Sequence, residues 1–460
     1  MKKILLSAAA FAMVAASAIA VAPNTAQAIP AFARQTGMAC YACHFQSFPA
    51  LAEFGRSFKR DAFTDVGSEA LVEDDNLSIP AVLNAALALH AAYSNVDNNA
   101  TTGTGGLPAN KAAPGFKKGI WSLPIEAPLM LAGRVGKNVG AFVEFDGGSQ
   151  PANGSPAANW QVMSSFDMGN FRMGLNAFDT SFGYTAGIET FNTFGQHDGV
   201  LNGGDVSAVV NIGNGNDAGP LGAGAVQTEG LTLWAGNDMW FAALTGWSPM
   251  PGAGASNIGF SLIPGIRVAV TPQVMGWDTE IGGGWTAGTV GATAVAATAG
   301  PNIVTPGYKV AGADLWFIDA QAQGSVGNTS VGVYADYAHT KAKTNVDYNV
   351  FGAQSMPDGL ATAANTGKTD GFSIRATIKP IPQWVFEAGY GQTKYTPTTG
   401  QSTKLKIWQI GGQYELYQNF NLKLMYEDDK ADVNYPTYTA PAGGGSQDVK
   451  VTTFELDALM

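Results

Sequence analysis

The chain has 460 residues, 58 of them glycine, and only 13% are charged, against about 25% in ordinary soluble domains. Its formal net charge is −11, which excludes nucleic-acid binding through a basic surface. Low charge together with abundant glycine also argues against a standard soluble α/β enzyme.

The first 28 residues have the pattern of a signal peptide. Lys2 and Lys3 form a basic start, residues 4–22 are apolar, and residues 26–28 read Ala-Gln-Ala, a small-residue cleavage site. We therefore predict that residues 1–28 are removed and that the protein works outside the cytoplasm.

The next feature is a Cys-x-x-Cys-His motif made by Cys40, Cys43 and His44, which contains the only two cysteines of the chain. This is the attachment signature of a c-type haem, in which both thiols bind the porphyrin edge and the histidine binds the iron. A plain disulfide would not need His44, and a redox Cys-x-x-Cys would need a thioredoxin-like βαβ unit. Zinc would need a second pair of ligands. We expect one covalent haem c.

A short helix is predicted after the motif, with Ser47 as its cap and Pro49 in its first turn. Leu51, Phe54 and Phe58 share one face, and the basic residues Arg56, Lys59 and Arg60 lie elsewhere. Residues 29–76 are too few to bury a core without a cofactor or another support. We interpret them as a monohaem cytochrome segment.

From about residue 78 the apolar pattern has a period of two. For example, every second residue from 384 to 390 is apolar, namely Trp384, Phe386, Ala388 and Tyr390, and the residues between them belong to the other face of the segment. No apolar run of about 18 residues follows the signal, so the sequence predicts no membrane-spanning helix. A transmembrane antiparallel β-barrel over residues 77–460 fits both observations.

Tight turns and long loops alternate along this region and predict about 16 strands, an even number that places both barrel ends on the periplasmic side. The first strand is expected over residues 78–93 and the last over 449–460, without the aromatic final residue common in such barrels. The tight turns are expected at 136–138, 167–170, 236–238, 272–273, 327–328, 380–383 and 418–419, and the long loops at 94–118, 181–225, 287–312 and 341–369.

Three residues are candidates for the sixth ligand of the haem iron: His90, Met38 and Met130. The alternation of inward and outward side chains along a strand predicts that His90 and Met130 face the barrel lumen, whereas Met38 is close to the motif in sequence. His90 also fits an ordinary polar residue of the lumen wall. His197 and His339 are interpreted as residues in or near outer loops.

Carboxylates form a second group of candidates. Residues 427–429 (Glu-Asp-Asp) are expected to end a strand at the outer rim, and residues 73–75 (Glu-Asp-Asp) to lie at the periplasmic mouth. Glu144, Asp319 and Asp336 are expected to face inward and to line a cation path. Carboxylates bind hard or borderline cations such as Fe²⁺, but solvated rim charge and simple lumen polarity explain the same residues.

The segment 29–44 (IPAFARQTGMACYACH), with Phe48-Pro49-Ala50-Leu51 and Phe54-Gly55-Arg56-Ser57-Phe58-Lys59, resembles the fused monohaem cytochrome–porins of iron-oxidising bacteria, the outer-membrane Fe(II) oxidases. The resemblance is dense over about 32 residues. Over the barrel it extends to length, strand number and the order of cytochrome before porin.

This resemblance implies a cytochrome segment that plugs the barrel from the periplasmic side, with haem c on Cys40, Cys43 and His44. It also implies that the protein is an enzyme, an iron oxidase, which takes electrons from extracellular Fe(II) and delivers them to a periplasmic c-type cytochrome. Two alternatives stay open: an electron conduit with another donor or acceptor, and a diffusion porin with a structural haem.

Overall fold

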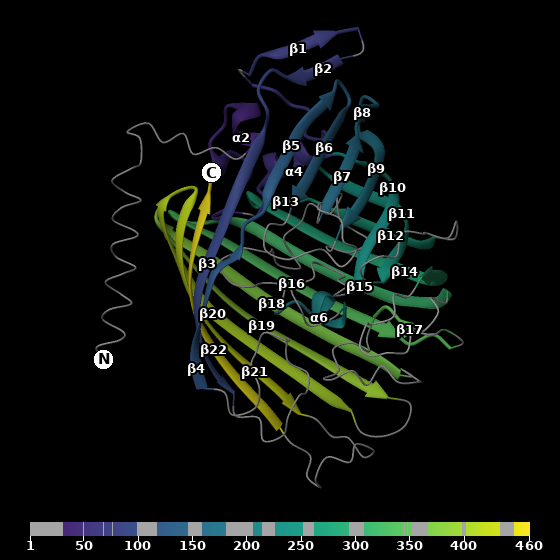
Figure 1. Cartoon of the computed structure of the whole chain (residues 1–460), viewed down its shortest axis with the longest axis vertical. Coiled ribbons are helices and arrows are strands. Elements are labelled where there is room, and N and C mark those ends of the chain that lie inside the picture. Colours follow the sequence, from purple (N-terminus) through teal and green to yellow (C-terminus); the bar gives the residue numbers. More distant parts are fainter. Residues whose placement is uncertain are drawn as a thin grey trace, which may run out of the picture.

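The computed structural model describes residues 31–48, 50–67, 69–75, 77–98, 117–145, 159–180, 206–213, 226–251, 262–293, 308–344, 346, 348–351, 367–397, 402–432 and 446–460. Its main body is a closed barrel of antiparallel strands (Figure 1). Among the helices of these residues, none is long and apolar enough to cross a membrane.

The barrel wall begins with β3 and closes where β22 pairs with β3. The pairs β4–β5, β7–β8 and β12–β13 are each one interrupted strand, and β17 is a short segment parallel to β15, so the wall has 16 strands, as predicted. The wall strands are β3 (Ala85–Asn98), β4 (Lys117–Glu126), β5 (Leu129–Gly136), β6 (Val139–Phe145), β7 (Asn159–Ser164), β8 (Phe166–Asp167), β9 (Arg172–Thr180), β10 (Val226–Gly236), β11 (Trp240–Pro251), β12 (Ile263–Val270), β13 (Gln273–Val274), β14 (Trp277–Thr293), β15 (Tyr308–Val326), β16 (Thr329–Lys341), β18 (Gly367–Ile381), β19 (Trp384–Pro397), β20 (Thr403–Tyr417), β21 (Phe420–Asp432) and β22 (Ser446–Leu459), with β17 at Tyr348–Asn349.

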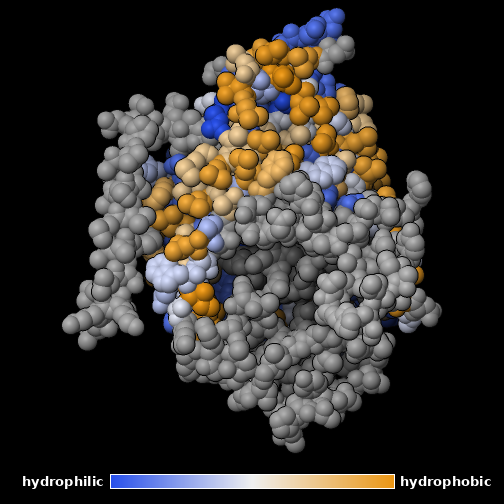
Figure 2. Space-filling view, viewed as in Figure 1, coloured by the Kyte–Doolittle hydropathy of each residue, from blue (hydrophilic) through white to orange (hydrophobic). Residues whose placement is uncertain are grey.

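Alternation assigns the two faces of these strands as expected. On β19, Trp384 and Phe386 are exposed on the outside, whereas Val385 and Glu387 are buried on the inside. Figure 2 shows the result: hydrophobic residues cover much of the described outer surface below the hydrophilic tip of the molecule. An outward apolar band of this kind is the surface that a transmembrane barrel presents to lipid.

Six of the seven predicted tight turns are confirmed, one is misplaced, and the strands differ from prediction mainly at their ends. The turn expected at 272–273 lies slightly later, at 275–276, because β13 continues the strand past Pro272. Several strands run further into the predicted loops: β3 reaches Asn98, and β14 reaches Thr293. Ladder hydrogen bonds to neighbouring strands extend these ends beyond the apolar pattern.

The predicted first strand over residues 78–93 is wrong at its start. The barrel strand β3 begins at Ala85, whereas β2 (Leu77–Pro80) pairs with β1 (Leu71–Asp74) in a separate two-stranded hairpin. This β1–β2 hairpin projects from the barrel at the end that carries the tight turns (Figure 1). Alternation alone cannot tell a barrel strand from such a hairpin, because both have the same period.

The N-terminal segment contains three short helices, α2 (Ala31–Thr36), α3 (Cys40–Cys43) and α4 (Glu53–Arg60). The predicted helix is therefore present, but it starts at Glu53 with Ala52 as its cap residue, so the expected Ser47 cap is wrong. Its buried face is also different from the prediction, since Arg56 and Arg60 are buried while Phe54 is exposed. The two arginines are buried because they form ion pairs with carboxylates of the barrel.

Candidate functional site

The two cysteines lie on one helical turn. α3 spans Cys40–Cys43, and His44 follows directly, with its backbone N–H donating to the Cys40 carbonyl at 2.9 Å. The thiols are not joined in a disulfide, and both are half-buried. Burial raises the pKa of Cys43 to about 11 and also raises the pKa of Cys40, so both remain protonated thiols near neutral pH. Residues three apart on a helix share a face, so both thiols are presented on one side of the turn.

The barrel wall holds this turn through Tyr41. The Lys379 ammonium of β18 lies 3.8 Å from the centre of the Tyr41 ring, a cation–π contact. Lys379 also donates to Glu415 of β20 at 3.0 Å and to the Gln46 carbonyl at 2.9 Å. Burial, followed by the neighbouring Glu415 carboxylate, raises the pKa of Tyr41. These contacts fix the cysteine turn against one side of the wall.

A close backbone approach joins α4 to the cysteine turn. A side chain at Gly55 would place its Cβ 2.2 Å from the Cys43 carbonyl oxygen, closer than real Cβ contacts allow. Gly140 of β6 shows the same feature against the N-terminal segment, because its Cβ would lie 1.8 Å from the Ala62 carbonyl oxygen. Glycine is therefore required both within the segment and in the wall that receives it.

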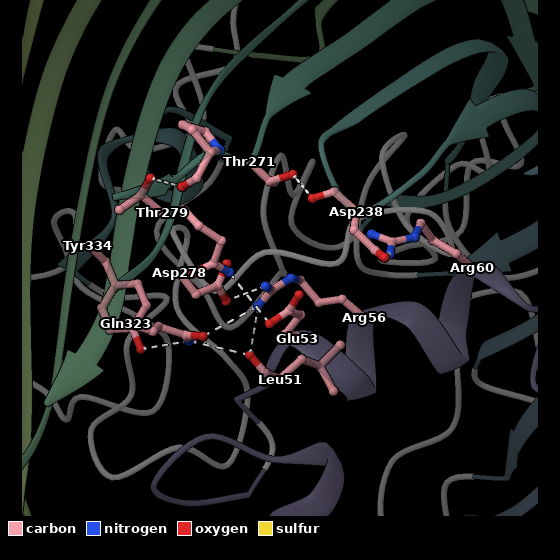
Figure 3. A network of polar contacts seen from close by, with 12 residues as sticks. Leu51, Glu53, Arg56, Arg60, Asp238, Thr271, Asp278, Thr279, Gln323 and Tyr334 are labelled. Carbon is pink, nitrogen blue, oxygen red and sulfur yellow. Dashed lines mark hydrogen bonds and ion pairs between the residues drawn. The ribbon is translucent and has the colours of Figure 1, made fainter. Parts of the chain in front are cut away.

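Further along the wall, α4 is anchored by Arg56 to β14 and β15. Its guanidinium is ion-paired with Asp278 of β14 and donates to Gln323 of β15 at 3.3 Å and to the Leu51 carbonyl at 3.4 Å. Gln323 donates in turn to Leu51 at 3.3 Å, so helix, preceding loop and wall form one network (Figure 3). Arg56 is only 2% exposed, and the network therefore belongs to the interior of the protein.

The end of α4 carries two further ion pairs to the barrel. Arg60 pairs with Asp238, in the turn between β10 and β11, and Asp61 lies 2.7 Å from Arg172 of β9. Burial raises the pKa of Asp61 to about 6, an effect that the Arg172 guanidinium opposes. These pairs place the helix end at the tight-turn end of the barrel.

Contacts of residues 31–67 reach the wall around most of its circumference. On a further side, Arg134 of β5 donates to the Thr64 carbonyl at 2.9 Å, and its backbone N–H donates to Gln35 at 3.0 Å. With the contacts above, the segment touches β5, β9, β14, β15, β18 and β20. We call residues 31–67 the plug, because they bridge opposite walls of the lumen.

Arg56 and Arg60 give a direct test of how the plug is held. Arg56→Ala should weaken plug docking by about 3–5 kcal/mol, because it leaves the Asp278 carboxylate, 15% exposed, without its ion pair. Arg60→Ala should cost about 0.2–1 kcal/mol, because its partner Asp238 is 69% exposed and water replaces the arginine. The measurement is the urea concentration at which protease cleaves the plug while the barrel stays folded. Equal losses in the two variants would contradict this account.

Apolar side chains fill the lumen beside the plug, where porin-like barrels are polar. One group, the plug cluster, joins Phe58, Ala62 and Phe63 to inward side chains of the wall and is completed by Phe32. The wall contributes Met163, Trp234, Phe241, Ala243 and Ala269. The segment thus has a core, but the barrel supplies more than half of it.

A second apolar group lies toward the long-loop end, and the sequence did not predict it. Residues 208–213 form the short helix α6 (Ala208–Gly213), which lies within the loop expected over 181–225 and packs on β16, β18 and β19. Its Val209 and Ile212 join inward side chains to form the loop cluster, which also includes Phe178, Trp247, Ile263, Val290, Ala313, Leu315, Phe317, Ala338, Val350 and Phe351. Described residues therefore occupy the lumen at two levels.

Two of the predicted cation-path carboxylates are bound to protein groups. Asp319 accepts from both terminal nitrogens of Arg267 at 2.8 and 2.7 Å, and Asp336 accepts the backbone N–H of Ala208 at 2.9 Å. Asp336 thus anchors α6, and these contacts favour simple lumen polarity over a cation path for both residues. Glu144 accepts from Asn159 at 2.9 Å.

The acidic triplet at residues 427–429 was placed wrongly. It does not end a strand, because β21 continues to Asp432, and all three side chains are buried rather than solvated at a rim. By contrast, Glu73, Asp74 and Asp75 lie on the exposed β1–β2 hairpin, at the tight-turn end. A run of charges in a strand does not reveal whether neighbouring side chains cover it.

The three candidates for a sixth ligand lie in different settings. His90 faces inward on β3 as predicted, is buried, and its Nδ1 lies 2.9 Å from Asp457. Met38 is 42% exposed beside the cysteine turn, and Met130 is on β5, opposite Ala86 in register. His339 is at the outer side of β16, 2.7 Å from Asp370, and His197 lies outside the described residues.

The chain matches no protein-family profile and no curated protein sequence. Solved structures similar to it include a loop L8 deletion mutant of OmpT, an outer membrane protein of Vibrio cholerae, with 12% identity, a TM-score of 0.46, and coverage of 82% of this chain and 99% of that one. The outer membrane channel DcaP of Acinetobacter baumannii has 13% identity, a TM-score of 0.46, and coverage of 82% and 97%. An anion-selective porin from Comamonas acidovorans has 12% identity, a TM-score of 0.42, and coverage of 81% and 99%.

Proposed function

We propose that the protein is an outer-membrane cytochrome–porin that oxidises extracellular Fe(II) and passes the electron through one c-type haem to a periplasmic c-type cytochrome. The observation that carries the proposal is the pair of unlinked thiols of Cys40 and Cys43, on one helical turn before His44, in a plug bound inside a closed barrel.

The donor groups of the plug fit a covalent haem c. Two unlinked thiols on the same side of a helical turn are the groups that bind the two vinyl carbons, and the imidazole that follows is an iron ligand. Bound there, the haem would accept and donate single electrons. Tyr41, Lys379 and Glu415 hold the cysteine turn against β18 and β20, and Arg56 holds α4 against β14 and β15.

The filling of the lumen favours electron transfer over solute diffusion. A barrel of 16 strands has room for an aqueous channel. Here the plug contacts opposite walls at the tight-turn end, and the loop cluster packs α6 against the wall toward the other end. Electrons need only short gaps between redox centres, whereas solutes need a continuous water-filled path.

The surface of the barrel supports the outer membrane as its location. Its outward side chains are apolar over much of the described surface (Figure 2). Tight turns connect the strands at the plug end. With tight turns in the periplasm, the plug lies on the side of the proposed electron acceptor. The Fe(III) product would then form outside the cell, where it needs no export.

Stopped-flow mixing of the oxidised, detergent-solubilised protein with Fe(II) near neutral pH tests this function. We expect rapid growth of the reduced c-type haem bands. A haem that stays oxidised with Fe(II) but is reduced by dithionite would contradict iron oxidation and favour another electron donor or electron export. A protein that holds no covalent haem would overturn the cytochrome assignment and leave a barrel.

A further inference from the structure

A cluster of metal-type ligands lies where the last strand of the barrel closes onto the first. His90 on β3 is directly opposite Asp457 on β22, and its Nδ1 lies 2.9 Å from the Asp457 Oδ1. Glu455 precedes Asp457 by two residues and so faces the same side of β22. Each of the three offers a ligand atom, and these atoms lie within 4.8 Å of one another.

These groups are suited to a divalent transition-metal ion. One imidazole and two carboxylates bind borderline ions such as Fe²⁺, Mn²⁺ and Zn²⁺. Ligand atoms at about 2.0–2.2 Å from one ion are about 3 Å apart when adjacent and about 4.3 Å apart when opposite. The His90–Asp457 separation already matches adjacent ligands, and small side-chain movements would bring Glu455 into place.

The site is buried and already holds a positive charge. His90 is 3% and Asp457 4% exposed, and the Lys423 ammonium of β21 lies 3.2 Å from Glu455 and forms an ion pair with Asp457. A lysine head is a compact charge on a flexible four-carbon stem, so it can leave when a stronger cation arrives. The two carboxylates thus require a cation whether or not a metal is present.

Charge balance by Lys423 does not account for the histidine. The inward neighbours of His90 on β3 itself are Ala88 and Ala92, both buried, so His90 is a polar side chain between two small apolar ones on this strand. An imidazole opposite Asp457 adds what the lysine–carboxylate pairs lack, a nitrogen ligand for a metal.

We propose that His90, Glu455 and Asp457 bind one divalent transition-metal ion at the seam of the barrel, with Lys423 balancing the carboxylates when the ion is absent. The bound ion links β3 to β22 by ligands from both strands. This site requires only the closed barrel. Its existence therefore does not depend on the haem or on iron oxidation.

Titration of the EDTA-treated, detergent-solubilised protein with Mn²⁺, followed by the EPR signal of free Mn²⁺, tests the site. We expect saturable binding of one Mn²⁺ per chain and a loss of affinity of at least about tenfold in His90→Ala. Lys423→Met should bind Mn²⁺ at least about tenfold more tightly, because it removes a positive charge beside the ion. His339→Ala is the matched control: it removes another strand histidine that lies 2.7 Å from an aspartate, and should leave binding unchanged.

Each variant is first checked for the heat-dependent gel shift of a folded barrel. If His90→Ala does not fold, Glu455→Gln replaces it, because the Glu455 side chain is partly exposed and tolerates the change better. Two outcomes overturn the proposal: no stoichiometric Mn²⁺ binding by either the wild type or Lys423→Met, or equal binding in the wild type and the ligand variant. The first would identify the cluster as a salt-bridge network, and the second would place the ion elsewhere.

Discussion

Replacing Cys43 with alanine should abolish stable covalent haem attachment and leave a barrel that still inserts into the membrane. Cys43 provides one of two thiols on a single helical turn, and the plug that carries them depends on the barrel wall for more than half of its apolar core. A segment with so little core of its own cannot retain a haem by packing alone, so the covalent bonds must do it. Haem staining of denaturing gels and the pyridine haemochrome spectrum measure the attachment.

Tyr41→Phe provides the control within the same motif. It keeps both thiols, His44 and the ring that lies over Lys379, and it removes only the hydroxyl, so haem should remain attached. Barrel insertion is followed in both variants by the heat-dependent gel shift. Normal covalent haem in Cys43→Ala would disprove the attachment site, and loss of haem in both variants would point to a general defect of the plug.

Much of the barrel could be predicted because its signals are local. Strand faces follow from alternation, as in Trp384 and Glu387, and the tight turns follow from short Gly- and Asn-containing sequences such as Gly327-Asn328. The error at the first strand has a long-range cause. Leu77 to Pro80 continues the alternating pattern, but its pairing partner is β1 rather than a barrel strand. Sequence periodicity identifies a strand and not its neighbour.

The contents of the lumen were much less predictable. The cysteine motif was found because its spacing is specific, but nothing in the helix at residues 53–60 indicates that Arg56 is buried. Its burial depends on Asp278, which is 222 residues away in the chain. Likewise, α6 is a short apolar helix in a loop rich in Gly and Asn, and Asp336 anchors it from a distant strand. Sites built from such contacts require the three-dimensional structure.

The structure also predicts how the protein behaves as a channel. In planar lipid bilayers the wild type should conduct far less than an open barrel of this size, because the plug and the loop cluster both occupy the lumen. Deleting residues 31–67 and 206–213 together should raise single-channel conductance at least about tenfold, since 16-stranded barrels otherwise enclose an aqueous channel. Deleting either segment alone should raise the single-channel conductance less, because the other segment still occupies the lumen.

Deletion of the β1–β2 hairpin, residues 71–80, provides the matched control, because this hairpin projects from the barrel and does not fill it (Figure 1). It should leave the conductance at the wild-type level. Porin-like conductance in the wild type would contradict the two-level filling and favour the diffusion-porin alternative, even if a haem is attached. If the wild type has low conductance and Fe(II) reduces its haem, electron transfer is the function that remains. Electrons would then cross a barrel that ions do not cross.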